Sequence, residues 1–256
     1  MSVSNKLINE NVLVVKPLKE ADNFRHVQGS IFAKELKSVN VTHARLTSKG
    51  SMIVKFPDDK AMSAAKNRLQ AHKKSFSVAR PKKILPKVTA LGVPSFFDKD
   101  SFLESLKTQN PAIKNLIDDE SLTFEILFHY NQNNNKIFVI KLDPRIRKII
   151  MDSSKGFLFI EMARVEVIDH YHILSCFYCQ IFGHSSSACS DSAIPSVCGK
   201  CTGPHRTAEC TSETLKCINC VNCKKPNVDH STHDKNKCSV YASGLNILKS
   251  NTDYGE

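Results

Sequence analysis

The first 90 residues alternate short apolar runs with two stretches in which apolar residues recur at helical spacing. An aspartate that can cap a helix precedes each helical stretch. The expected elements are a strand at 12–15, a helix after Asp22 (Phe24, Val27, Ile31, Phe32), a hairpin of 41–46 and 52–56 around 48–50, a helix after Asp58 (Ala61, Ala65, Leu69) and a strand at 76–80. This β-α-β-β-α-β order predicts a ferredoxin-like fold.

Residues 84–175 repeat the same order. In this unit, the apolar side chains of Leu122, Phe124, Ile126 and Phe128 alternate strictly with their neighbours, which predicts a half-buried strand. The other expected elements are a strand at 84–91, a helix after Asp98 (Phe102, Leu103, Leu106), an Asn-rich turn at 131–135, a strand at 137–142, a short helix at Asp143-Pro144 (Ile146, Ile149, Ile150) and a last strand at 157–168.

RNA-recognition-motif domains share this topology and bind RNA through aromatic rings exposed on the sheet. The corresponding third-strand stretch of the first unit, 49–56, has Ser51 and Ile53 at the two stacking positions. In the second unit, the stretch 135–142 exposes aliphatic side chains or buries its Phe138. The usual mode of sheet-face binding is therefore not expected in either unit.

Positive charge is concentrated in the first unit. The chain has a formal net charge of +11, and residues 1–90 hold 18 Lys and Arg against 6 Asp and Glu. Basic side chains near phosphates release condensed counterions, so a compact basic block is typical of a protein that binds polyanions. The alternative is a solvated cationic face and linker. The candidate phosphate contacts are Lys73, Lys74, Arg80, Lys82, Lys83 and Lys87.

All ten cysteines lie between Cys176 and Cys238. Zinc takes four tetrahedral ligands, and a C-x2-C turn followed by a short loop can supply them. Gly183 and Gly203 allow the tight backbone of such loops. Two segments fit: Cys176, Cys179, His184 and Cys189 are spaced C-x2-C-x4-H-x4-C, and Cys198, Cys201, His205 and Cys210 are spaced C-x2-C-x3-H-x4-C. Disulfides are disfavoured because the amino end shows no signal-peptide pattern.

A third set leaves its histidine ligand open. Cys217 and Cys220 begin it and Cys238 ends it, but both His230 and His233 are available. His233 repeats the H-x4-C ending of the other sets. Cys223 is spare, and its pairing with Cys220 in place of Cys217 is also allowed by geometry. The sequence therefore predicts a third zinc site without identifying all of its ligands.

Three thiolates and one imidazole leave no coordination position open, which indicates structural and not catalytic zinc ions. The segments are too small to bury a core, so metal binding would supply their folding energy, about 10–16 kcal/mol apparent. Zinc, in three sites, is the expected cofactor.

Side chains suited to unpaired bases surround the first two sets. Phe177, Tyr178 and Phe182 could stack on a base, and the second set offers Lys200 and Arg206. The alternative for Phe177 and Phe182 is that they cover the metal site. Both roles can coexist.

The motifs resemble those of the Gag-like first-frame proteins of arthropod non-LTR retrotransposons. The residues that carry this resemblance are VIDHYHILSCFYCQIFGH at 167–184, CGKCTGPHRTAEC at 198–210, and the pair Cys217 and Cys220 followed by Asp229-His-Ser-Thr and Cys238-Ser-Val-Tyr. The resemblance covers residues 122–241. It implies a nucleocapsid-like packaging or chaperone protein, with RNA-recognition-like domains before three zinc knuckles and His230 as the third histidine ligand.

The expected protein is therefore α+β, with two RNA-recognition-motif-like domains (1–83 and 84–175), three CCHC-type zinc knuckles (176–238) and a disordered tail (239–256). Its expected partner is single-stranded RNA or DNA, with possible self-association. No membrane or small-molecule partner is expected, and the location is intracellular, cytoplasmic or nuclear. A zinc module that binds only proteins is the alternative. An enzyme is disfavoured, because the zinc-deaminase, H-E-x-x-H, phosphate-loop and G-x-S-x-G motifs are absent.

Overall fold

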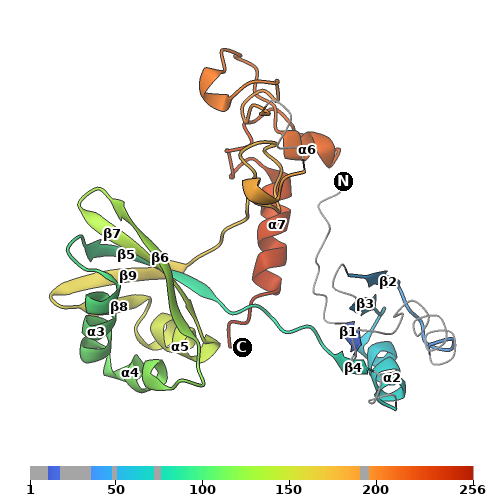
Figure 1. Ribbon diagram of the computed structural model, residues 1–256, viewed down its shortest axis with the longest axis horizontal. Helices are drawn as coiled ribbons and strands as arrows, with labels where there is room; N and C mark the ends of the chain where they lie inside the picture. Colours follow the sequence, from blue (N-terminus) through green and yellow to red (C-terminus); the bar gives the residue numbers. More distant parts are fainter. Residues whose placement is uncertain (1–10, 18–35, 48–50, 72–75, 191–195, 256) are drawn as a thin grey trace. The chain divides into compact units, whose positions relative to one another are not determined.

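The computed structural model describes residues 11–17, 36–47, 51–71, 76–190 and 196–255 (Figure 1). The chain divides into two compact units between Lys83 and Ile84. The helix predicted after Asp22, the turn at 48–50, and the candidate contacts Lys73 and Lys74 lie outside the described residues.

The first unit is a four-stranded antiparallel sheet in the order β2-β3-β1-β4. Its strands are β1 (Val12–Pro17), β2 (His43–Leu46), β3 (Met52–Lys55) and β4 (Phe76–Ala79). Helix α2 (Asp59–Gln70) begins at its Asp58 cap, whose carboxylate accepts the Ala61 N–H at 2.7 Å. The helix buries Ala65 and Leu69 in the core of this sheet.

The second unit contains a five-stranded antiparallel sheet in the order β6-β7-β5-β9-β8. The strands are β5 (Lys87–Pro94), β6 (Phe124–Gln132), β7 (Asn135–Leu142), β8 (Phe157–Ile160) and β9 (Ala163–Asp169). The helices on one face are α3 (Lys99–Gln109), α4 (Pro111–Asp118) and α5 (Pro144–Lys148), which continues as a π-helical turn (Ile149–Ser153) (Figure 1). Phe102 stacks on Phe138 in the core between them, with ring centroids 4.2 Å apart.

The predicted fold class is confirmed. In the first sheet β1 lies between β3 and β4, and in the second β5 lies between β7 and β9, so in each the first strand of the unit lies between the third and the last, as in the ferredoxin-like arrangement. The single last strand predicted at 157–168 is wrong, because β8 and β9 form a hairpin whose turn places Glu161 at φ 53°. This turn has neither Gly nor Pro to mark it. Helix α4 is an element that the hydrophobic pattern missed.

Strand β6 contains one residue more than its partner. Ile126 pairs with Ile140, but the next described pair is Phe128 with Val139. Two steps along β6 therefore match one step along β7, which makes Leu127 the extra residue of a β-bulge. Such an insertion re-aims the side chains that follow it.

The bulge changes the face on which two large rings lie. Strict alternation predicts that Phe128 shares the core-facing side of β6, yet Phe128 and Tyr130 are 47% and 48% exposed. His129 takes the inner side, with its ring centroid 5.1 Å from that of the core residue Phe138. The predicted alternation holds up to Ile126 and is wrong beyond it.

The carboxyl-terminal segment forms a helix and is not the disordered tail expected at 239–256. Helix α7 (Ser239–Ser250) follows the third cysteine set directly. Beyond it, the Ile84 N–H donates to the carbonyl of Asn251 and the Asp253 N–H donates to the carbonyl of Ile84, both at 2.9 Å. The end of the described chain therefore pairs with the segment that leads into β5.

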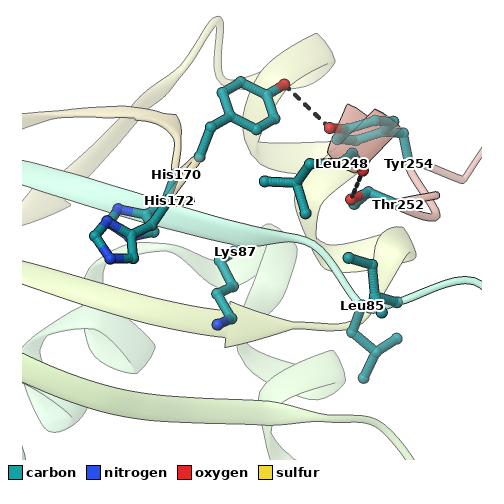
Figure 2. A pocket seen from close by; sticks show the side chains of 9 residues that line it. Leu85, Lys87, His170, His172, Leu248, Thr252 and Tyr254 are labelled. Carbon is teal, nitrogen blue, oxygen red and sulfur yellow. Dashed lines mark hydrogen bonds between the residues drawn. The ribbon is translucent and has the colours of Figure 1, made fainter. Parts of the chain in front are cut away.

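Side chains strengthen this attachment. The Arg147 guanidinium lies 4.3 Å from the centroid of the Tyr254 ring and makes two hydrogen bonds of 2.8 Å to Asp169. The Tyr254 hydroxyl donates to that of Tyr171 at 3.1 Å (Figure 2). A small cavity of about 70 Å³ lies beside these rings. In the described part of the chain, no helix combines the length and apolar character needed to cross a bilayer.

Candidate metal centres

Three clusters of side chains each bring together three thiols and one imidazole. In every cluster the four candidate ligand atoms lie within 4.8 Å of one another. The clusters are Cys176, Cys179, His184 and Cys189; Cys198, Cys201, His205 and Cys210; and Cys217, Cys220, His230 and Cys238. We call the segments that carry them the first, second and third knuckles.

The distances between these atoms fit the edges of a tetrahedron around a metal ion. Ligands at about 2.3 Å (S) and 2.0 Å (N) from zinc would lie about 3.8 Å (S···S) and 3.5 Å (S···N) from each other. In the third knuckle, Cys217 and Cys238 lie 3.8 Å apart at Sγ, and Cys220 Sγ lies 3.6 Å from His230 Nε2. These sulfurs are also too far apart for disulfides, whose S–S length is about 2.05 Å. The donor set therefore suits a metal ion.

Backbone N–H groups favour the thiolate form that binds metal. Burial raises the pKa of Cys198, but hydrogen bonds from the backbone of Cys201 and Lys200 and from neighbouring thiols lower it to about 6. A hydrogen bond from Cys238 is the main cause of a Cys217 pKa lowered to about 4. These hydrogen bonds therefore favour the anionic form of Cys198 and Cys217.

The geometry separates the two histidines that the sequence left open. His230 is 1% exposed and belongs to the third cluster, with Cys217, Cys220 and Cys238. His233 is outside it, and its ring lies against Gly199 so closely that a Cβ there would overlap it. Cys223 is also outside the cluster.

One buried polar atom in the third knuckle is consistent with a bound ion. His230 turns Nε2 toward Cys220, while its Nδ1 is buried without a hydrogen-bond partner in the described part of the chain. A buried ring nitrogen without a partner destabilises the fold. A metal bond at Nε2 would fix the ring in this orientation and offset that cost.

The third knuckle is packed against both of the others. Asn219, which is 1% exposed, accepts the Phe182 N–H at 2.9 Å and donates to the Gln180 carbonyl at 2.8 Å. Toward the second knuckle, the Thr232 N–H donates to the Gly199 carbonyl at 2.8 Å. The three knuckles therefore form one body with the third at its centre, and not three separate units on a flexible chain.

The first and second knuckles together form a groove of about 500 Å³. Phe177 and Tyr178 line it from the first knuckle and Arg206 from the second, and His233 of the third knuckle contributes as well. Phe177 is 77% exposed and Tyr178 is 44% exposed. Three side chains that the sequence predicted as nucleic-acid contacts are thus brought to one place. His233 was expected only as a metal ligand, and nothing in its spacing signals a place in the groove.

Two other predicted contacts are elsewhere. Phe182 is 7% exposed and packs edge-on against Tyr241, with ring centroids 5.8 Å apart, so it covers the third knuckle and is not free to stack on a base. Lys200 is exposed but is not among the residues that line the groove.

The predicted basic contacts outside the knuckles differ in whether they are paired with a carboxylate. Arg80 lies 2.5 Å from the carboxylate of Asp59 in a solvent-exposed ion pair. Lys82 and Lys83 are exposed at the end of the first unit, and Lys87 is exposed at the start of β5 in the second unit.

Two curated proteins are similar to part of this chain, whereas no family model matches it. Both are named nucleic-acid-binding protein from mobile element jockey. The protein of Drosophila melanogaster is 44% identical over 124 residues, and that of Drosophila funebris is 30% identical over 128 residues. The matches cover 47% and 49% of this chain and 20% of each relative, so the chain spans about a fifth of their length. The resemblance inferred from the motifs is confirmed over about half of the chain.

Among solved structures, the first two RRM domains of yeast poly(U) binding protein (Pub1) match with a TM-score of 0.23 and 11% identity, over 63% of this chain and 99% of that one. This likeness is too low to support an inference, and the fold class rests on the strand order described above.

Proposed function

We propose that this protein binds single-stranded nucleic acid, RNA in the first instance, in the groove between its first two knuckles. The supporting observation is that exposed rings from one knuckle and a guanidinium from the next line the same groove. Unpaired bases stack on aromatic faces and phosphates pair with Arg, so this combination suits a single strand of any sequence.

We further propose that each of the three clusters holds a structural zinc ion through its three thiolates and one imidazole. Thiolate-rich tetrahedral sets select zinc, and a site with four protein ligands has no position for a substrate. The chain therefore acts by binding and not by catalysis. Reduced thiols of this kind belong to an intracellular protein.

The charge of the sites themselves favours stacking as the source of affinity. Three thiolates and one zinc ion give each knuckle site a net charge of about −1, so the sites do not attract phosphates. Phe177 and Tyr178 are then the main contacts in the groove, with Arg206 neutralising a phosphate.

Replacing Phe177 with alanine is the direct test of the groove. We expect the affinity for a fluorescein-labelled oligouridylate to fall about 5- to 150-fold, because one base can no longer stack on a ring. The zinc content should stay unchanged, since the ring is 77% exposed and is not a ligand. Fluorescence anisotropy measures the affinity and native mass spectrometry the metal. Wild-type affinity in this variant would show that the ring has no part in binding.

The basic end of the first unit should contribute through phosphates. Changing Lys82 and Lys83 together to glutamine is expected to flatten the plot of log affinity against log salt concentration, by about 0.7 for each phosphate that is no longer neutralised. Both side chains are exposed. Anisotropy titrations over a range of KCl concentrations give the slope, and an unchanged slope would remove these lysines from the interface.

By analogy with the similar proteins from a mobile element, we propose a Gag-like packaging or chaperone role for the binding. Such a role requires sequence-tolerant affinity for single strands. Affinities within a few-fold across oligonucleotides of different sequence would support it, whereas strong preference for one sequence would contradict it.

A further inference from the structure

The second sheet carries a row of rings on the face opposite its helices. Tyr130 and Phe128 lie 6.4 Å apart between ring centroids, and the Phe128 ring meets that of His170 edge-on, also at 6.4 Å. The rings of His170 and His172 are nearly parallel at 6.3 Å. Figure 2 shows these two histidines together, near Lys87. We call these four residues the ring row.

The β-bulge at Leu127 creates this row. Without the extra residue, Phe128 would share the inner face of β6 with Ile126, as the alternation predicts. With it, Phe128 and Tyr130 point outward and remain about half exposed. Bulges of this kind are frequent next to functional sites, where they re-aim a side chain.

The ring row lies over buried residues of the sheet, and a hydrogen bond fixes the orientation of one of its rings. Thr89 and Val139 beneath it are buried, and the Thr89 hydroxyl lies 2.8 Å from His170 Nδ1. Burial, together with the charges of His172 and Lys87, lowers the pKa of His170 and favours its neutral ring. A hydrogen-bonded neutral ring offers a flat face at low entropic cost.

We propose that the ring row is a second binding surface for single-stranded nucleic acid, separate from the groove between the knuckles. Its exposed faces can stack on unpaired bases, and Lys87 lies exposed beside it, with no ion-pair partner in the described part of the chain, to meet a phosphate. Two imidazoles, a phenol and an ammonium suit a charged strand better than an apolar protein surface.

The test uses the full chain with zinc bound. Phe128→Ala and Tyr130→Ala should each weaken binding of a fluorescein-labelled oligouridylate about 5- to 150-fold, because each removes one ring on which a base can stack. Phe96→Ala is the matched control, because Phe96 is 70% exposed on the same domain but stacks only on Phe97. Its affinity should equal that of the wild type.

A second pair of variants separates stacking from packing. Phe128→Tyr keeps a ring and should retain the affinity, whereas Phe128→Leu keeps apolar bulk without a π face and should lose it. Circular dichroism and zinc content confirm that each variant folds. If Phe128→Leu binds like the wild type, stacking at this position is ruled out.

Photo-crosslinking locates the contact. An oligonucleotide containing 5-bromouridine should crosslink to the peptide that carries Phe128 and Tyr130, and should do so equally in a Phe177→Ala background. If crosslinks occur only in the knuckles, or if the ring-row variants change self-association in sedimentation but not affinity, the proposal is overturned while the groove is left standing. If the wild-type chain crosslinks at the ring row but not in the knuckles, the proposed groove is contradicted instead.

Discussion

Replacing Cys220 with serine is expected to release more than one metal ion and to unfold the segment 176–250, while the second sheet stays folded. A structural zinc site contributes about 10–16 kcal/mol of apparent folding free energy, as much as a whole domain usually has. Cys220 is fully buried, 3.6 Å from His230 Nε2 and 3.7 Å from Cys238 Sγ. Its loss removes a ligand at the centre of the knuckle body.

The effect should spread because the other knuckles are attached to this centre. Asn219, next to Cys220, holds the backbone of the first knuckle through two hydrogen bonds, and Thr232 holds that of the second. Native mass spectrometry should show a loss of more than one zinc, and hydrogen exchange should rise throughout 176–250. Loss of a single zinc, with full protection of the first two knuckles, would contradict the central place of the third.

Cys223→Ser is the matched control. Cys223 is the same residue type three positions further on, but it lies outside the cluster and is only partly buried. We expect no change in zinc content or hydrogen exchange. A loss of zinc in this variant would show that Cys223 is a ligand, as one of the pairings allowed by the sequence requires.

Removing the metal with a chelator should lower the affinity for oligouridylate about 30-fold or more. Phe177 and Arg206 come from two different knuckles, so the groove they line exists only while both are folded. Unfolding then abolishes at least two stacking interactions together, each worth about 1–3 kcal/mol. Anisotropy titrations before and after dialysis against EDTA measure the change, and restoring zinc should restore the affinity.

The binding that remains after chelation distinguishes the ring row from the groove between the knuckles. It should be sensitive to Phe128→Ala and no longer sensitive to Phe177→Ala, because the second sheet does not depend on metal. Unchanged affinity in a chain shown to be free of metal would exclude the groove as the binding site.

The first two clusters could be predicted fully because their ligands are close in sequence. Each set spans a single short loop, so the spacing of Cys176 to Cys189 and of Cys198 to Cys210 determines which atoms can meet. The third set spans a longer segment with two histidines. The spacing lets either imidazole face the thiols, and the fold places His230 among them and His233 against Gly199.

The strand order of the first sheet and the places of β5, β6 and β7 in the second were predictable from hydrophobic spacing, but the β8–β9 hairpin and the bulge were not. Up to Ile126 the alternation in β6 continues without interruption, and Leu127 is as apolar as its neighbours. Nothing in the pattern marks the extra residue. For the same reason, the exposed rings of Phe128 and Tyr130 could not be distinguished from core residues. For Phe182 the sequence left open whether the ring stacks on a base or covers the metal site, and the structure buries it against the third knuckle.

Helix α7 returns the chain to the domain from which it came. After β9 the chain enters the knuckle body, and beyond α7 it pairs with Ile84 at the entrance to β5. The three knuckles are thus connected to the second sheet at both ends of their segment, which restricts their rotation more than a single linker would. A strand already stacked in one place would therefore meet the other at a raised effective concentration, so the two contacts should form and release nearly as one event.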